Sequence, residues 1–286
     1  MTLRLAALAA TVVLAVLVAA GCGGGGSSKS GFPVVGAAKT YELVHFVPSG
    51  PVEPGVPVHV SFTIRQPDGT PLTQFKTGPG PHTGVHLIMV RRDLSTIVHR
   101  HPPISADGTI SDTVTLPGPG PYRVVVDAYP ATGTQPNFQL FSSLRVRGTY
   151  TPQPIGSYRS TAIVDGYRFH LLGKPDLHAI QAGIVHATVT APNGKPAAFE
   201  PWYGALAHAV FFRQGSLDYF HTHVCAPGAA GCTSVLGATK VTGESSTPGK
   251  LAVGVLVPVP GTWRLFLQCQ VDGHVLTAPF TLTVKP

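Results

Sequence analysis

The pattern of apolar and polar positions along the chain is typical of short β-strands. Apolar residues come in short runs rich in Val, Thr, Phe and Tyr, and Pro-Gly, Asp-Gly and Asn-Gly pairs separate these runs. Such pairs mark turns, and strand-like runs recur about every 8 to 15 residues, as in an immunoglobulin-like β-sandwich. The sequence therefore predicts an all-β fold.

The chain also repeats one plan. The turn Pro67–Pro71 matches Pro192–Pro196, and the segment Gly108–Arg123 matches Gly249–Arg264 without a gap. Two copies of a β-rich plan predict two tandem immunoglobulin-like β-sandwich domains joined by a proline-containing linker. The predicted boundaries are residues 39–149 for domain 1 and residues 157–286 for domain 2.

Each copy carries three histidines with the spacing H-x12-H-x-H. They are His86, His99 and His101 in the first copy, and His208, His221 and His223 in the second. A hairpin with the four-residue turn 92–95 pairs position 90 with 97, 88 with 99 and 86 with 101. Directly opposed residues share a face of the sheet, so all three histidines project from one face. A turn at 214–217 gives the second copy the same arrangement.

The neighbours of these histidines suggest which face they occupy. Ile88, Val90 and Ile97 share the histidine face of the first hairpin, whereas Arg91 and Arg100 lie on the other. We therefore expect the histidines to point inward, at the rim of the core of their own sandwich, and each domain to hold a separate site.

Three buried imidazoles need polar partners. One metal ion can bind a nitrogen of each ring, with metal–nitrogen distances of about 2.0 to 2.1 Å. Neutral imidazoles suit Cu(II) or Zn(II), and an oxidising compartment favours Cu(II). The candidate fourth ligand is His82 or water in the first copy and His274 or water in the second. Asp127, aligned with Gln268, is a candidate to orient a histidine, and the alternative for it is an ordinary polar residue of the sheet. The alternative is a set of core-rim histidines bonded to the backbone, with no metal.

The N-terminus has the features of an export signal. Residues 1–22 contain a basic residue at Arg4, an apolar run and small residues before Cys22. This segment predicts a signal peptide, and its ending resembles a bacterial lipobox, which implies a lipid on Cys22 and a flexible tether at 23–38. The expected location is extracytoplasmic, anchored to the outer face of the cell membrane; secretion without an anchor is the alternative.

Cys225 and Cys232 enclose a short loop and predict a disulfide in an oxidising compartment. This pairing leaves Cys269 unpaired, although three cysteines also allow other pairings.

Charge and motifs exclude two classes of function. The net charge of +7 comes with no cluster of basic residues, so nucleic-acid binding is not expected. The chain contains no H-E-x-x-H, G-x-S-x-G, Walker-type or C-x-x-C motif, and an enzyme is not expected.

Around these histidines the sequence resembles a group of actinobacterial secreted or lipoprotein chains. The shared features are a strand-borne His, an Asp-Leu-Ser turn, a His-x-His-Pro segment and a later Gly-x-Tyr/Trp-Arg strand; the chain also looks broadly like small periplasmic copper-handling β-sandwiches. The resemblance implies metal association, with copper favoured, for the six spaced histidines. Two hypotheses follow: an envelope lipoprotein that captures, buffers or delivers copper, and a tandem immunoglobulin-like interaction module, with a protein partner in the envelope and no metal.

Overall fold

A computed structural model describes the chain at residues 40–133, 137–232, 235–236 and 239–286. The predicted signal peptide, the lipidation site Cys22 and the tether at 23–38 lie outside the described residues. In the part that is described, no helix is both long and apolar enough to cross a membrane.

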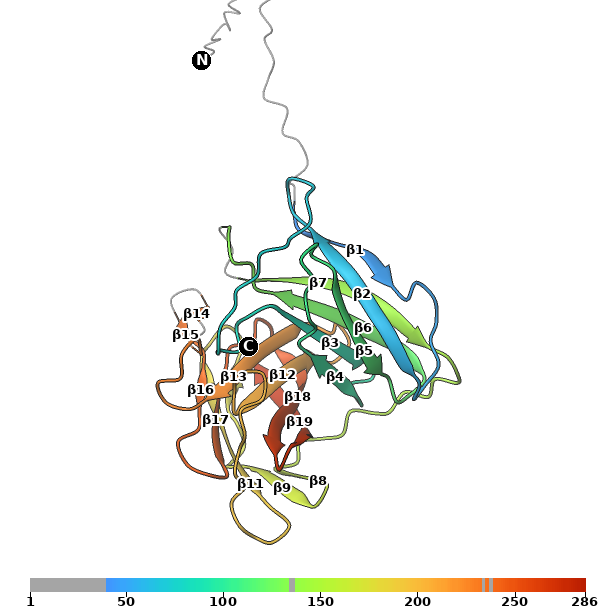
Figure 1. The fold of residues 1–286 in the computed structure, drawn as a ribbon. Coiled ribbons are helices and arrows are strands. Elements are labelled where there is room, and N and C mark those ends of the chain that lie inside the picture. Colours follow the sequence, from blue (N-terminus) through green and yellow to red (C-terminus); the bar gives the residue numbers. More distant parts are fainter. Residues whose placement is uncertain (1–39, 134–136, 233–234, 237–238) are drawn as a thin grey trace, which may run out of the picture. The chain divides into compact units, whose positions relative to one another are not determined.

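The first half of the described chain, residues 40–146, forms two antiparallel sheets (Figure 1). Their orders are β1-β2-β5 and β4-β3-β6-β7. The strands are β1 (Glu42–Val47), β2 (Pro57–Arg65), β3 (Val85–Arg91), β4 (Ile97–Arg100), β5 (Ile110–Thr115), β6 (Gly120–Ala128) and β7 (Phe138–Val146).

The two sheets of the first half enclose one hydrophobic core. Phe62 of β2 and Val114 of β5 meet Leu87 and Met89 of β3 and Val124 of β6 in this core, and all five are almost fully buried. Alternate residues of each strand point to the same face, so the inward residues of both sheets share one apolar layer. This half is an immunoglobulin-like β-sandwich.

The second half, residues 161–286, uses one continuous sheet with the order β10-β19-β18-β12-β13-β16-β17-β11-β9-β8. The short strand β16 pairs with both β13 and β17 and so joins two groups of strands. The strands are β8 (Thr161–Val164), β9 (Tyr167–Leu171), β10 (Leu177–His178), β11 (Gly183–Thr190), β12 (Ala207–Arg213), β13 (Tyr219–Cys225), β16 (Gly243–Glu244), β17 (Lys250–Val255), β18 (Gly261–Val271) and β19 (His274–Lys285), and the pair β14 (Val235–Leu236) and β15 (Thr239–Lys240) lies apart.

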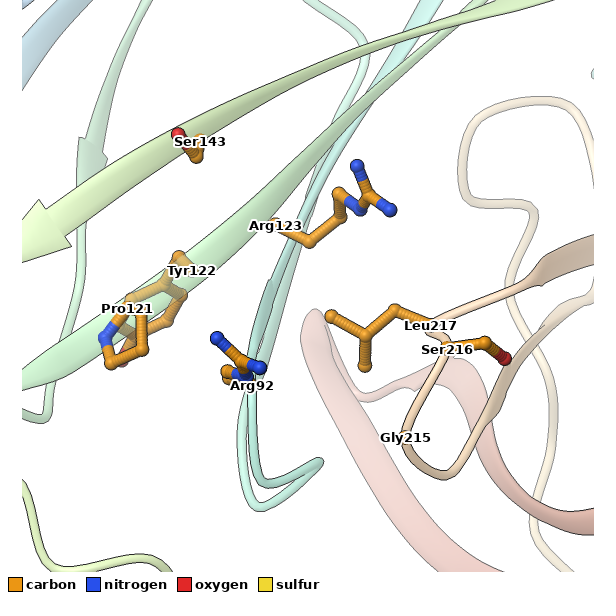
Figure 2. A pocket seen from close by; sticks show the side chains of 8 residues that line it. All are labelled: Arg92, Pro121, Tyr122, Arg123, Ser143, Gly215, Ser216 and Leu217. Atoms are coloured by element: carbon orange, nitrogen blue, oxygen red, sulfur yellow. The ribbon is translucent and has the colours of Figure 1, made fainter.

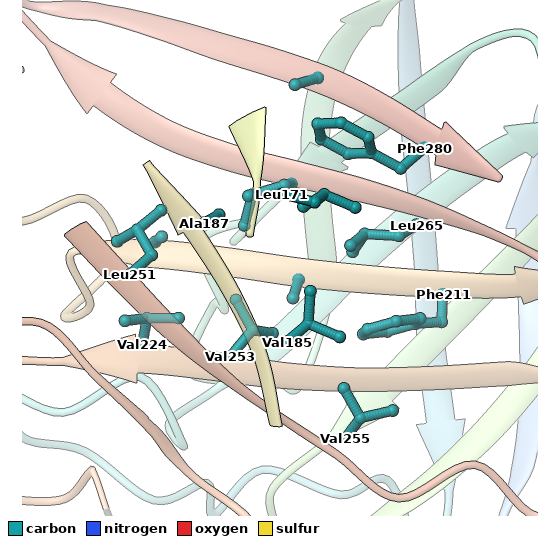
Figure 3. Close-up of a cluster of buried hydrophobic side chains, with 14 of the residues drawn as sticks. Leu171, Val185, Ala187, Phe211, Val224, Leu251, Val253, Val255, Leu265 and Phe280 are labelled. Carbon is teal, nitrogen blue, oxygen red and sulfur yellow. The ribbon is translucent and has the colours of Figure 1, made fainter. Parts of the chain in front are cut away.

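The strands on the two sides of β16, which are β10-β19-β18-β12-β13 and β17-β11-β9-β8, contribute to a second hydrophobic core (Figure 3). Val185 of β11 and Val253 of β17 belong to the same buried cluster as Phe211 of β12, Leu265 of β18 and Phe280 of β19. The order β13-β12-β18-β19 follows the same plan as β4-β3-β6-β7 of the first half. The predicted all-β sandwich class is therefore confirmed.

The predicted linker between the two halves contains no strand. Strand β7 ends at Val146 and β8 begins at Thr161, so the predicted boundaries at 149 and 157 fall between them. Residues Lys39–Pro286 nevertheless form one compact unit, and the division into two domains stays a prediction.

The predicted hairpins are confirmed residue by residue. Ile88 pairs with His99 and Val90 with Ile97, and Arg91 N–H donates to Thr96 C=O across the first turn. In the second hairpin His208 pairs with His223 and Val210 with His221, with a comparable turn. Five of the histidines consequently occupy the predicted face of their hairpins, and the ring of His101, one residue beyond the end of β4, stacks on that of His86 with centroids 3.9 Å apart.

The predicted direction of that face is wrong. The sandwich cores contain the alternate residues Leu87 and Met89, or Ala209 and Phe211, while the residues beside the histidines form a third cluster between the two halves. This interface cluster comprises Ile88, Val90, Leu94, Val125, Val210, Phe212, Leu217 and Phe266. Strand β3 is buried along its whole length, so alternation places the histidines on one face without telling which face is the sandwich core.

Candidate metal centre

The two predicted histidine triplets lie in one cluster. The first triplet, His86, His99 and His101, brings its ring nitrogens together as predicted, whereas the members of the second are divided between two groups that include histidines of the first half. His86 Nδ1 of the first half lies 3.2 Å from His221 Nδ1 of the second, and the rings of His99 and His208 have centroids 5.0 Å apart. Each hairpin presents its histidines outward from its own sandwich, and the two outward faces meet. The prediction of separate sites at the rims of separate cores is therefore wrong.

Three groups of histidines within the cluster each bring three ring nitrogens within 4.8 Å of one another. Each group shares one member with each of the others, and the shared members are His86, His99 and His221. The centroids of these three rings are 5.8, 5.1 and 5.0 Å apart. The groups are His86, His221 and His223; His86, His99 and His101; and His99, His208 and His221.

Oxygen acceptors fix the proton on three of the rings. His86 Nε2–H donates to Pro81 C=O at 2.7 Å, and His208 Nε2–H donates to Trp202 C=O at 2.9 Å. His99 Nδ1–H donates to Gln268 Oε1 at 3.0 Å, since the Gln268 amide NH2 donates to Thr277. A neutral imidazole carries one N–H, so the second nitrogen of each ring keeps a free lone pair.

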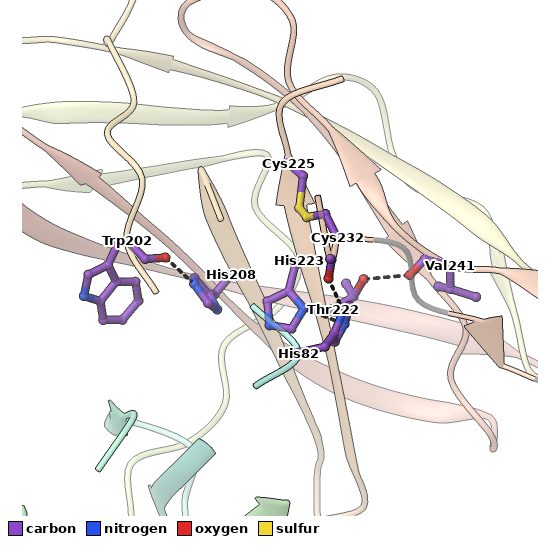
Figure 4. The surroundings of a disulfide bond; sticks show 9 residues. His82, Trp202, His208, Thr222, His223, Cys225, Cys232 and Val241 are labelled. Carbon is purple, nitrogen blue, oxygen red and sulfur yellow. Dashed lines mark hydrogen bonds between the residues drawn. A yellow bond between two sulfur atoms is a disulfide. The ribbon is translucent and has the colours of Figure 1, made fainter. Parts of the chain in front are cut away.

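His82 also belongs to the cluster, through His223. Its Nδ1–H donates to Gly231 C=O at 3.1 Å, which leaves Nε2 to accept from His223 Nδ1–H at 3.1 Å (Figure 4). The lone pair of His223 is thereby placed on Nε2. His274, the other predicted fourth ligand, is exposed at the start of β19, and none of the ring contacts or hydrogen bonds between described residues joins it to the cluster.

Burial keeps the cluster neutral. His86 and His208 have no exposed surface, and desolvation lowers the pKa of His86 to about 3 and that of His208 to about 4. Desolvation, followed by the charges of neighbouring histidines, also lowers the pKa values of His99, His101, His221 and His223. Among the described residues, the Nε2 atoms of His99, His101 and His223 are buried without a hydrogen-bond partner, which is costly in the absence of a ligand.

Aromatic rings and closely packed loops cover the cluster. The Tyr203 ring stacks on His101 with centroids 3.9 Å apart, and Trp202 meets His99 edge to face. Behind His82, a Cβ on Gly80 would lie 2.7 Å from the backbone of Gly231, and one on Gly204 would lie 2.7 Å from that of Gly80. Glycine at these positions lets the backbones of loops from the two halves pack in direct contact.

Asp127 and Gln268 occupy corresponding positions and have different partners. Asp127 pairs with His86 across the sheet, yet its carboxylate accepts from the hydroxyls of Tyr129 and Tyr219, both at 3.4 Å. The residue that orients a histidine is Gln268, and the histidine is His99 of the other half. The candidate role suggested for Asp127 thus belongs to its counterpart.

At the turn end of the interface a pocket of ≈ 280 Å³ lies between the halves (Figure 2). Arg92 and Arg123 line it from the first half, and the turn at Gly215–Leu217 closes it from the second. None of the residues that line it is a histidine, so the histidine cluster and this pocket lie at opposite ends of the interface.

The predicted Cys225–Cys232 disulfide is present beside His223 at the end of β13 (Figure 4). Cys269 is free and buried, and desolvation raises the pKa of its thiol to about 12, so it stays a thiol and contributes packing. A structural disulfide is consistent with an extracytoplasmic location.

The second half of the chain matches a known domain family. Residues 162–286 match the model of a domain of unknown function, DUF8832. The match begins in β8 and includes His208, His221 and His223. No curated protein matches the chain.

Several solved structures are distantly similar to this chain. An α2-macroglobulin mutant from Salmonella is 15% identical over 89% of this chain and 15% of its own, with a TM-score of 0.27. The fibronectin(III)-like modules of Clostridium thermocellum CbhA are 12% identical over 85% and 93% of the two chains, with a TM-score of 0.22. A putative membrane anchored protein from Corynebacterium diphtheriae is 10% identical over 87% and 59%, with a TM-score of 0.24. This chain therefore spans a small part of the macroglobulin, and these values carry no information on function.

Proposed function

We propose that this protein binds a transition metal, with Cu(II) favoured over Zn(II), in the histidine cluster between its two halves. It would act as an envelope lipoprotein that captures, buffers or delivers copper. The observation that carries the proposal is the convergence of six predicted histidines into one buried cluster in which three nitrogens have no hydrogen-bond partner.

The spacing of the ring nitrogens suits a shared ion. Ligand nitrogens about 2.0 to 2.1 Å from one ion lie about 2.9 to 3.4 Å apart when they are 90° to 109° apart. His86 Nδ1 and His221 Nδ1 are 3.2 Å apart, and His208 Nδ1 and His221 Nε2 are 3.4 Å apart. Carbonyl acceptors behind His86 and His208 are the kind of second partner that metal-bound histidines usually have.

The donor set and the location favour copper. The cluster consists of neutral imidazoles, which suit Cu(II) and Zn(II). The described contacts bring no thiolate into it, because Cys269 is a buried thiol and Cys225 and Cys232 are paired with each other. An oxidising compartment, which the disulfide favours, keeps copper as Cu(II). Cys22 would anchor the chain to the outer face of the membrane.

Titration of the purified, metal-free protein with Cu(II) and Zn(II) tests the proposal. We expect stoichiometric Cu(II) uptake, measured by absorbance and by electron paramagnetic resonance. His99→Ala and His221→Ala each remove a member shared by two groups, so the affinity should fall by more than about 100-fold, beyond the effect of losing a supporting hydrogen bond.

The matched control is His274→Gln, which changes a histidine outside the cluster and should leave the affinity unchanged. Absence of uptake of either ion at micromolar concentrations would overturn the proposal and leave the tandem immunoglobulin-like interaction module as the explanation of the fold.

A further inference from the structure

His221 occupies a position unlike that of any other histidine in the cluster, because both of its ring nitrogens face a lone pair. His86 and His208 both hold their proton on Nε2, where a backbone carbonyl accepts it. Their Nδ1 atoms are therefore acceptors, and they lie 3.2 Å from His221 Nδ1 and 3.4 Å from His221 Nε2, respectively. A neutral His221 has one N–H and can satisfy only one of these two contacts.

Two of the three groups of ring nitrogens contain His221. One consists of His86, His221 and His223, and the free lone pair of His223 is on Nε2 because His82 accepts its other proton. The other consists of His99, His208 and His221, and the free lone pair of His99 is on Nε2 because Gln268 accepts its other proton. His86 lies against His221 Nδ1 and His208 against His221 Nε2, so we assign the two groups to opposite nitrogens of the His221 ring.

We infer that the cluster binds two metal ions bridged by His221, one held by His86, His221 Nδ1 and His223, the other by His99, His208 and His221 Nε2. This inference rests on the proposed function and specifies its stoichiometry. Binding of the second ion breaks the remaining N–H bond of His221, and the proton passes to solvent. The imidazolate that remains donates one lone pair to each ion, and neither ion changes its oxidation state.

The bridge explains how a duplicated hairpin gives an asymmetric centre. Both ions take ligands from both halves, so neither half holds a complete set by itself. His101 lies outside the two sets, stacked on Tyr203 with a buried, unpartnered Nε2, and it belongs with His86 and His99 to the third group of nitrogens.

Copper content and spin count of the full chain test the bridge. The metal-free protein is loaded with Cu(II), freed of excess metal and analysed for copper per chain and for paramagnetic resonance intensity. We expect two copper ions per chain and fewer than half of the spins of two isolated ions, because the imidazolate couples the two unpaired electrons. Loading with equal amounts of Cu(II) and Zn(II) should restore an uncoupled copper signal in mixed chains.

Substitution of the bridge separates it from the other ligands. His221→Gln should abolish the coupling, so that the spin count equals the copper content, whereas His186→Gln, on the exposed side of β11, should leave the coupling intact. One copper ion per chain, or two with the full spin count, would overturn the bridge and leave the proposed function standing. No bound copper at all would overturn both, and because the wild-type measurement decides these cases, the test does not depend on the variant folding.

Discussion

The interface between the two halves has an apolar end and a histidine end, and both are built from the same face of the same two hairpins. Towards the turns this face carries Ile88, Val90, Val210 and Phe212, which are fully buried. Towards the open ends it carries the histidines. The backbone pairing is equivalent at both ends, so the difference lies in the side chains alone.

Because of this difference, the apolar end contributes stability and the histidine end contributes binding capacity. Burial of apolar side chains stabilises the interface without any ligand, whereas the histidine end buries lone pairs that are satisfied only in part and opposes folding until something binds them. Because the apolar end holds the halves together, we expect the histidine end to stay assembled when no metal is bound. Substitutions at the apolar end should therefore lower the free energy of unfolding at any pH. Changes at the histidine end should alter the pH dependence of stability and the affinity for Cu(II).

Acid should produce the largest effect, and it acts on the histidine end. Burial lowers the pKa of His86 to about 3 and that of His208 to about 4, whereas histidines of the unfolded chain titrate near 6.5. Below that pH the unfolded state binds protons first, so the free energy of unfolding falls by about 1.4 kcal/mol per pH unit for each histidine that stays neutral in the fold.

Asp127 acts in the opposite direction, because burial raises the pKa of its carboxyl to about 6 and the folded chain gains a proton there first. Two histidines against one aspartate still leave a net loss of about 2 kcal/mol between pH 7 and pH 5, and His99, His221 and His223 each add up to about 2 kcal/mol. Urea unfolding of the metal-free protein at pH 7, 6 and 5 measures the slope. Stability that does not change over this range would show that the cluster is already protonated or solvated.

The second prediction concerns the apolar end. Phe212 is fully buried in the interface cluster and its ring centroid is 5.5 Å from that of Tyr219. Phe212→Ala should lower the free energy of unfolding by about 3 to 5 kcal/mol through lost burial and a residual cavity. Unlike the acid effect, this loss should be the same at pH 7 and at pH 5, and a loss that grows with acidity would mean that the two ends are coupled.

The sequence could predict the geometry within each hairpin because that geometry is local. A four-residue turn and the alternation of strands place His86, His99 and His101 on one face whatever lies opposite. The pairing of Ile88 with His99 and of Val210 with His221 follows from the same rules. The Cys225–Cys232 disulfide was predictable for a similar reason, since a short loop brings the two residues together.

The sequence could not predict where that face points, because both faces of β3 are buried. Leu87 and Met89 face the sandwich core while Ile88 and Val90 face the other half, and hydrophobicity alone does not distinguish the two surfaces. The contacts of Gln268 with His99 and of Tyr203 with His101 cross the interface, so no pattern within either copy could have indicated them. The predicted roles of the first 38 residues, as signal peptide and tether, stay predictions.

The smallest predicted effect distinguishes Gln268 from Asp127, its counterpart in the first half. Gln268→Leu leaves His99 Nδ1–H without its acceptor and frees the ring to turn its lone pair away from the other histidines. We expect Cu(II) affinity to fall about 10- to 100-fold, as for other residues that orient metal-bound histidines, which corresponds to about 1.4 to 2.8 kcal/mol. Competition titration with a chelator of known affinity measures the change.

Asp127→Asn is the matched variant, because the Asp127 carboxylate contacts Tyr129 and Tyr219 and no histidine side chain. It should alter stability and the acid response while leaving the Cu(II) affinity within about twofold. Equal losses of affinity in both variants would mean that the interface as a whole, and not the proton position on His99, sets the strength of binding. A loss confined to Gln268→Leu would place the control of affinity on a single cross-interface hydrogen bond.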